Sequence, residues 1–427
     1  DAQSGAVIFA QDANGSFQPA STMKLIVGGA VLTQLGADYS FLTDALTDGS
    51  VSEGVLHGRL YLRGGGDPTL DEAAMQDAAN ALRAQSISRV DGELVVDAAH
   101  FDASEYPPGW VIDDLPQDYA APVSGLSYDD NAVTLALTPG ASVASPVNLA
   151  MHPQTSSVTV TNDAITGAAK SRDTTVLERP LGDPRAIRVT GSLPLDTPSE
   201  ELVASAGVPE LFAADALQSS LASVGIRTSA VREGGTPPRA RVLWHHRSVP
   251  VRDLLAKMWL PSDNLLAESL LEELGTASEG TGDTRERGID RETAWLRTLG
   301  IDPATLSISD GSGLSQYDRI TPASLVTLLR ALWLSSNRAS VLAALPVAGQ
   351  SGTLRDAFVG SSLAGHVVAK TGSMSHVRTL AGYLVTPART LVFALFVNDW
   401  MDSSAEAGAE VRDMQQRFLE AAASTHP

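Results

Sequence analysis

The stretch Pro19-Ala20-Ser21-Thr22-Met23-Lys24-Leu25-Ile26-Val27 places a serine and a lysine at the start of an apolar run. The turn residues Asn14-Gly15 precede it, so we expect a loop that becomes a buried helix at Ser21. Because residues three apart share one helix face, the Lys24 amine can reach the Ser21 hydroxyl. A serine attacks a carbonyl only when a base takes its proton, and a lysine is that base when its surroundings lower its pKa. The stretch therefore predicts a serine nucleophile activated by lysine.

Two more short strings follow in the order that such a site needs, Ser262-Asp263-Asn264 and Lys370-Thr371-Gly372. Either string alone is weak, because a long chain meets such patterns by accident. A leucine at every fourth position over residues 266–274 predicts a helix that Gly275 closes. The first string stands at the entry of this helix, so we expect its serine and asparagine to project into a cleft.

The third string lies in a strand-like run over residues 366–373. Two further strand-like runs, at 379–385 and 391–397, follow after short turns and predict an antiparallel meander. Lys370 and Gly372 face one side of such a strand. There Lys370 supplies a second cation, and Gly372 leaves the backbone open for a substrate along the edge.

The three strings, in this order, resemble those of the penicillin-binding serine DD-peptidases, in particular the low-molecular-mass class C group of D-Ala-D-Ala carboxypeptidases and endopeptidases, peptidase family S13. The resemblance runs the whole length of the chain. Further matching segments are Pro19-Ala20, Gly64-Gly65-Gly66-Asp67-Pro68, Asp310-Gly311-Ser312-Gly313-Leu314-Ser315 and Gly352-Thr353-Leu354. The resemblance implies an α/β (α+β) fold built on a penicillin-recognising serine transpeptidase/β-lactamase-like domain, with an antiparallel sheet flanked by helices.

The wide separation of Ser21 and Ser262 marks the subgroup, because it leaves room for a large inserted accessory region. We expect a catalytic DD-peptidase domain over residues 1–43 and 239–427. Residues 44–238 then form an accessory α/β domain, in which a smaller β-rich domain is nested near 145–195.

Local patterns assign several elements of these domains. Val7-Ile8-Phe9-Ala10 predicts a strand, and residues 405–423 predict an amphipathic helix with Val411, Met414, Phe418 and Leu419 on one stripe. In the insert we expect strands at 55–63 and 92–96 and helices at 71–84 and 209–224.

The resemblance implies a mechanism of acylation and deacylation. Ser21 would attack the carbonyl of the penultimate D-alanine of a peptidoglycan stem peptide while Lys24 takes its proton. Backbone N–H groups of Ser21 and Ser373 would stabilise the oxyanion. Water would then hydrolyse the acyl-enzyme, and β-lactam antibiotics would act as covalent inhibitors.

The other two strings would handle the rest of the substrate. Ser262 would relay a proton to the leaving D-alanine amine, and Asn264 would position the substrate amide. Lys370 and Thr371 would hold the terminal carboxylate. The sequence leaves open which group is the base and which is the relay.

Trp110, Asp113, Asp114 and Tyr119 form an aromatic and acidic patch in the insert. A loop tethered by a buried tryptophan explains this patch about as well as ligand binding does. In the family that the chain resembles, a similar insert segment lines the pocket for the free end of the stem side chain, and an acidic residue meets its ammonium.

The segment after Ser315 departs from the family. Many relatives carry an arginine there and an asparagine two positions on, whereas this chain has Gln316 and Asp318. A glutamine cannot clamp a carboxylate with a bidentate ion pair. We expect a weaker demand for the stem side-chain carboxylate, or recognition of an amidated one.

Composition excludes other classes. The 427-residue chain has 50 acidic and 30 basic residues, a formal charge of −20 and no cysteine, which argues against a nucleic-acid partner and thiol catalysis. No apolar run approaches the length of a transmembrane segment. His245-His246, His366 and His376 lack metal-ligand spacing, so we expect neither a metal nor a cofactor. Gly64-Gly65-Gly66-Asp67 reads as a turn before a helix capped near Thr69 rather than a phosphate loop.

Two alternatives and a location complete the expectations. A β-lactamase would need a deacylating group that is not found between the second and third strings, and a catalytically silent cell-wall-binding protein would be expected to lose the nucleophile or its base. Carboxypeptidase and endopeptidase activities are not distinguished by any residue. By resemblance we expect an exported protein of the periplasm or cell envelope whose signal peptide has been removed.

Overall fold

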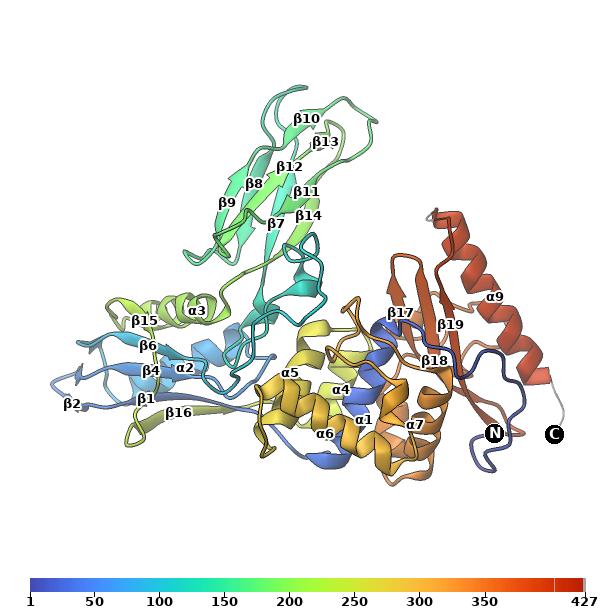
Figure 1. Ribbon diagram of the computed structural model, residues 1–427. Coiled ribbons are helices and arrows are strands. Elements are labelled where there is room, and N and C mark those ends of the chain that lie inside the picture. Colours follow the sequence, from blue (N-terminus) through green and yellow to red (C-terminus); the bar gives the residue numbers. More distant parts are fainter. Residues whose placement is uncertain (403, 425–427) are drawn as a thin grey trace. The chain divides into compact units, whose positions relative to one another are not determined.

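The computed structural model describes residues 1–402 and 404–424, which form two compact units (Figure 1). The first unit comprises Asp1–Ser40, Pro107–Trp110 and the chain from Val249 onward. The second unit comprises Phe41–Tyr106 and Val111–Ser248.

In the first unit, helices surround α1 (Lys24–Gln34), which follows the 3₁₀ turn Ala20–Met23. Residues 25–32 of this helix are apolar or glycine and all buried, as expected for a helix in the middle of a core. Two glycines let neighbours approach closely, because a Cβ on Gly28 would lie 2.4 Å from Trp259 and one on Gly29 would lie 2.8 Å from Trp295. The other helices are α4 (Val251–Trp259), α5 (Asn264–Thr276), α6 (Thr284–Thr298), α7 (Pro322–Leu334) and α8 (Arg338–Ala344).

The meander expected at the end of the chain is confirmed. β17 (Val367–Met374), β18 (Val377–Val385) and β19 (Thr390–Asn398) pair antiparallel in that order. α9 (Ala405–Ser424) lies against β18 (Figure 1). Leu419 is buried there, but Met414 is 43% exposed and Gln415 is buried instead, so the predicted apolar stripe is wrong at that position.

The predicted strand at residues 7–10 is wrong. No strand is assigned there, and Phe9 is 60% exposed, with its ring centroid 5.3 Å from that of Phe418 in α9. An apolar run favours an extended backbone, but a strand forms only when a neighbouring strand pairs with its backbone N–H and C=O groups. The run at 7–10 is paired with no strand among the described residues.

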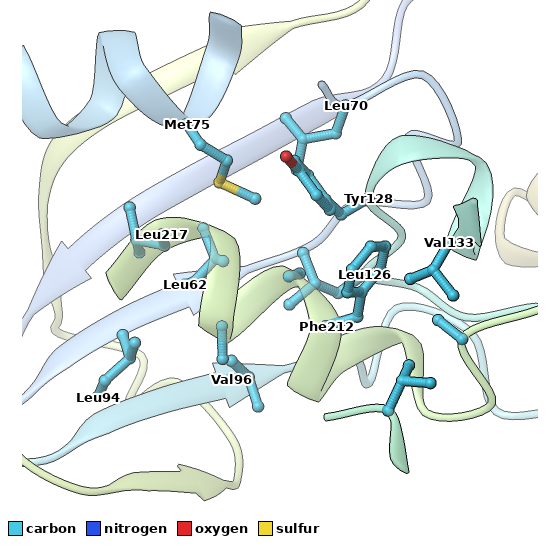
Figure 2. Packing of buried hydrophobic residues seen from close by; sticks show 14 of the residues in the cluster. Leu62, Leu70, Met75, Leu94, Val96, Leu126, Tyr128, Val133, Phe212 and Leu217 are labelled. Atoms are coloured by element: carbon cyan, nitrogen blue, oxygen red, sulfur yellow. The ribbon is translucent and has the colours of Figure 1, made fainter. Parts of the chain in front are cut away.

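The second unit is built on a five-stranded sheet of order β15-β6-β4-β1-β16. Figure 2 shows α2 (Glu72–Ala84) and α3 (Pro209–Ser223) beside the sheet, with Met75 and Leu217 close to Leu62, Leu94 and Val96. The strands are β1 (Leu42–Thr47), β4 (Leu60–Arg63), β6 (Leu94–Asp97), β15 (Val231–Glu233) and β16 (Arg241–Arg247).

Two local expectations in this unit are corrected. The cap of α2 is Asp71, whose carboxylate accepts from Ala74 N at 2.9 Å, and not Thr69, which instead bonds to Asp67. The strand expected at 55–63 is broken at Gly58, where φ is +153°. Its first part, β3 (Val55–His57), pairs with β2 (Ser50–Ser52) and β5 (Arg89–Val90) in a separate small sheet.

The remainder of the second unit is rich in short strands. β7 (Ala132–Thr138), β8 (Asn148–His152) and β14 (Glu200–Ser205) form one sheet, and β9 (Thr159–Asn162), β11 (Val176–Glu178) and β12 (Ala186–Thr190) form another. β10 (Ile165–Gly167) and β13 (Ser192–Pro194) form a pair. β16 lies beyond Pro237-Pro238, at which the sequence suggested the insert ends, and it pairs with β1 of the second unit.

Candidate active site

Ser21 lies in the 3₁₀ turn before α1, and its Oγ is 3.0 Å from Lys24 Nζ. The serine is partly exposed, while the lysine side chain is fully buried. Ala20, just before the serine, has φ +45°, a left-handed conformation that turns the chain sharply into the helix. The spacing of three residues thus has the consequence expected from the sequence.

Lys24 is held by two further acceptors. Its Nζ donates to Asn264 Oδ1 at 2.5 Å and to the Ser312 carbonyl at 2.8 Å. Burial lowers the pKa of Lys24 to about 8, although the charges of nearby carboxylates, Asp310 first among them, oppose the fall. A lysine with such a pKa has an appreciable neutral fraction near neutral pH, so it can accept a proton.

The second and third strings meet at Lys370. Its Nζ donates to Ser262 Oγ at 2.8 Å and to the Thr371 carbonyl at 2.8 Å. Burial, followed by the charge of Lys24, pushes the pKa of Lys370 well below its ordinary value. Ser262 has φ +74°, and Asp263 caps α5 by accepting from Leu266 N at 2.8 Å. This tight entry presents Ser262 to one lysine and Asn264 to the other.

The outer edge of β17 is covered at its start, and further on it pairs with no strand of the described residues. Ala369 N donates to Pro346 O at 3.0 Å, so residues 371 and 373, which share its orientation by the period of two, direct their backbone groups to the same edge. Ser373 N is therefore oriented as an oxyanion donor would need to be. Thr371 Oγ1 bonds to Thr353 Oγ1 at 2.7 Å.

Gly372 has a packing role that the sequence did not indicate. A Cβ there would lie 2.1 Å from Thr379 Oγ1 and 2.8 Å from Pro19 O. The glycine therefore allows the turn that carries Ser21 to lie directly on the sheet. The sequence suggested that Gly372 leaves the backbone open at the strand edge. The backbone groups that point to this edge belong instead to residues 371 and 373.

The loop at residues 310–315, called here the lysine-binding loop, supplies the carbonyl that accepts from Lys24. Glu268 of α5 accepts from Gly311 N at 3.1 Å and Ser312 N at 2.8 Å. A Cβ on Gly313 would lie 2.0 Å from Ala20 O, so this loop also contacts the 3₁₀ turn that contains Ser21. Sequence reasoning missed Glu268, although its position four residues after Asn264, among leucines, is a usable signal for a buried acid facing the site.

The expected patch of Trp110, Asp114 and Tyr119 is divided between the two units. Trp110 belongs to the first unit, where its Nε1 donates to Asp310 Oδ2 at 2.9 Å. Asp114 and Tyr119 belong to the second, where the Tyr119 hydroxyl donates to Asp114 Oδ1 at 2.8 Å. Trp110 thus supports the lysine-binding loop, while Asp114 and Tyr119 are linked to one another.

Gln316 is exposed, immediately after the lysine-binding loop. Its Oε1 accepts from Gln18 Nε2 at 3.0 Å, and its backbone N donates to Gly109 O at 3.0 Å. Asp318, the other departure, is fully buried. In the part of the chain that the structure describes, no group of three or more His, Cys, Asp or Glu side chains is arranged to hold a metal ion.

Comparisons with known proteins identify the family of the chain. The family model described as "D-Ala-D-Ala carboxypeptidase 3 (S13) family" matches residues 1–422. The D-alanyl-D-alanine carboxypeptidase of Actinomadura sp. (strain R39) is 33% identical, covering 93% of this chain and 76% of that protein. The D-alanyl-D-alanine carboxypeptidase DacB of Haemophilus influenzae is 27% identical, covering 93% of this chain and 84% of that protein.

Solved structures share the fold. The crystal structure of penicillin binding protein 4 (dacB) from Haemophilus influenzae superposes with a TM-score of 0.87 at 24% identity, covering 97% of this chain and 93% of that chain. The Bd0816 predatory endopeptidase from Bdellovibrio bacteriovorus superposes with a TM-score of 0.56 at 16% identity, covering 97% of this chain and 88% of that chain.

Proposed function

The chain belongs to the D-Ala-D-Ala carboxypeptidase 3 (S13) family, and we propose that Ser21 is the nucleophile of its reaction. It is a serine-type D-Ala-D-Ala carboxypeptidase, a hydrolase that removes the terminal D-alanine from stem pentapeptides of peptidoglycan. The observation that carries the assignment of Ser21 is its 3.0 Å contact with a fully buried lysine.

Acylation begins when Ser21 Oγ attacks the carbonyl carbon of the penultimate D-alanine. The hydroxyl proton passes to the neutral amine of Lys24, and the negative charge develops on the carbonyl oxygen. Backbone N–H groups of Ser21 and Ser373 stabilise that charge. The C–N bond to the terminal D-alanine then breaks, and its nitrogen takes up a proton as it leaves.

Ser262 and Lys370 serve the leaving group. The 2.8 Å contact between them makes a path by which a proton reaches the departing amine through the Ser262 hydroxyl. A neutral Lys370 gains a proton when the substrate's terminal carboxylate approaches, because an opposite charge favours the ammonium form. Thr371 adds a hydroxyl for the same carboxylate, and Asn264 orients the substrate amide.

β-Lactams enter the same reaction as substrates that deacylate slowly. The Haemophilus protein has been solved in complex with a β-lactam. In this chain, the contacts of Lys24 with Ser21 and of Lys370 with Ser262 support acylation of Ser21 by penicillins. Among the described residues, no helix is long and apolar enough to span a bilayer. A peptidoglycan substrate supports a location outside the cytoplasmic membrane, in the periplasm or cell envelope.

The first experiment is intact-mass analysis after penicillin treatment. We expect one penicilloyl adduct on the wild type and none on Ser21→Ala. Ser16→Ala, an exposed serine five positions earlier, is the matched control and should be acylated like the wild type. An adduct that persists on Ser21→Ala would remove Ser21 as nucleophile, and D-alanine release from a pentapeptide would then be measured for all three proteins.

Gln316 governs the preference for the stem side chain. Its amide can donate and accept single hydrogen bonds, but it offers no ion pair to a carboxylate. We expect pentapeptides with free and amidated diaminopimelate to be cleaved at similar rates, and Gln316→Arg to favour the free acid. A strong wild-type preference for the free acid would contradict this role of Gln316.

A further inference from the structure

Asp318 is fully buried next to the lysine-binding loop, and its two carboxyl oxygens have different surroundings. Oδ1 accepts from Ser309 N at 2.7 Å. Oδ2 receives no hydrogen bond from a donor in the described chain, and the Asp318 carboxyl group lies within hydrogen-bonding reach of the Asp310 carboxyl group. Two carboxyl groups therefore meet in a buried place.

The partner in this pair is well supplied with donors. Asp310 accepts from Gly313 N at 2.7 Å, Ser315 N at 2.7 Å, Ser312 Oγ at 3.1 Å and Trp110 Nε1 at 2.9 Å. Such hydrogen bonds stabilise the ionised form of a carboxyl group. A second buried carboxyl group beside this one, with an oxygen that receives no hydrogen bond from the described residues, is more stable without charge, so the proton resides on Asp318.

The charges around the pair reinforce this assignment. Glu268 of α5 and Glu292 of α6 are also buried, and burial raises the pKa of each to about 8. Arg285 of α6 donates to Glu272 at 2.8 Å, and Lys24 of α1 faces Asp310. Arg319 directs its Nη1 to the backbone carbonyls of Gln316 and Asp318. Burial, together with the charge of Asp310, raises the pKa of Asp318 well above its ordinary value.

We propose that Asp318 is a positioning residue for acylation: as a neutral acid it donates an O–H···O hydrogen bond to Asp310 and so fixes the lysine-binding loop whose Ser312 carbonyl holds Lys24. Loss of that proton would place two negative charges in contact and loosen the loop. The carbonyl of Ser312 would move away from Lys24, and proton transfer from Ser21 would slow. This inference rests on the proposed role of Ser21 and Lys24.

The test compares wild type, Asp318→Asn and Asp318→Ala in the rate constant for acylation by penicillin from mildly acidic to alkaline pH. Asparagine supplies an N–H donor that does not titrate, so Asp318→Asn should keep the neutral-pH rate within about twofold, whereas Asp318→Ala should lose about tenfold. At alkaline pH the wild-type rate should fall relative to that of Asp318→Asn. Asp302→Asn, an exposed aspartate of the same unit, is the control and should keep the wild-type profile.

A second measurement covers the case in which the alanine variant does not fold. The infrared difference spectrum between wild type and Asp318→Asn at neutral pH should contain the C=O stretch of a protonated carboxylic acid, and ¹³C-labelled aspartate should shift it. Superimposable pH profiles of the two proteins, or the absence of that band, would overturn the proposal. Failure of the proposed nucleophile would differ from both, because penicillin would then still form its adduct on Ser21→Ala.

Discussion

The two units of this enzyme bury different kinds of side chain. The first unit buries Lys24 and Lys370 together with acidic groups such as Glu268, Glu292 and Asp310. The second unit buries mainly apolar side chains, and ion pairs such as Arg188 with Asp163 lie on its surface. Buried charge costs stability, and here it is concentrated in the unit where pKa values must be shifted for chemistry.

The second unit has an informative exception. Asp67, in the glycine-rich turn, is buried, and burial raises its pKa. Its Oδ1 accepts from Thr69 N at 2.9 Å and Thr69 Oγ1 at 2.8 Å, so one oxygen is committed to the turn. A buried acid alone therefore does not mark a reactive site; the lysines next to buried acids do.

The largest expected effect comes from removing a buried lysine. Lys24→Met should lower the acylation rate by about 10²–10⁴-fold, or about 3–5 kcal/mol of barrier, because the proposed general base is lost. The measurement is the rate of penicilloyl adduct formation. Lys257→Met, an exposed lysine of α4, should retain the wild-type rate. A fall of less than tenfold for Lys24→Met would mean that buried charge in the first unit is not catalytic.

The apolar core of the second unit should respond in stability. Phe212 is buried with its ring centroid 5.1 Å from that of Tyr128, and Phe212→Ala should lower the free energy of unfolding by about 3–5 kcal/mol through the cavity that it leaves. Urea unfolding measures the change. Leu181→Ala, at an 85% exposed position, should change stability by less than about 0.5 kcal/mol. Equal effects of the two substitutions would contradict the assigned core.

A substitution of the buried Glu292 tests how a buried carboxyl group makes the free energy of unfolding depend on pH. Burial, with the charges of Glu268 and Asp310, raises its pKa to about 8, so the native state keeps a proton that the unfolded chain releases. This contribution to stability is complete below about pH 4.5 and is lost as the pH rises to about 8. Glu292→Gln should therefore gain on the order of 3–4 kcal/mol relative to wild type between pH 5 and pH 8.

The comparison for this prediction is Glu286→Gln, an exposed position on the same helix. Its stability should follow the wild-type dependence on pH throughout. Thermal unfolding at a series of pH values measures all three proteins. A constant difference between Glu292→Gln and wild type would show that Glu292 is ionised in the native state.

The smallest effect is expected at the surface of the second unit. Arg63 Nη2 lies 2.6 Å from Asp44 Oδ2, with the arginine side chain 45% exposed. Arg63→Ala should change the free energy of unfolding by less than about 1 kcal/mol, because solvent and salt screen the exposed arginine end of this pair. Unfolding at low and high salt checks this. A loss above about 2 kcal/mol would place a strong ion pair where only a weak one is expected.

Sequence reasoning succeeded where the decisive contacts are local. Ser21 and Lys24 are three residues apart, so helix geometry alone brings them together. The strand-like runs at 366–373, 379–385 and 391–397, with short turns between them, were enough to predict the meander. It failed where a contact depends on distant partners, as for the unpaired run at 7–10. The pairing of Asp318 with Asp310 was also missed, because the sequence showed a departure from relatives but not the burial that gives it meaning.

The two glycines of α1 limit which substitutions the chain can accept during evolution. Gly28 lies against Trp259 and Gly29 against Trp295, closer than any Cβ could be, and Trp259 Nε1 also donates to Lys24 O at 2.9 Å. A lineage that replaced either glycine would have to shrink its tryptophan in the same step or displace the helix. The position of Ser21 therefore depends on two glycines and two indole rings, none of which takes part in the proposed chemistry.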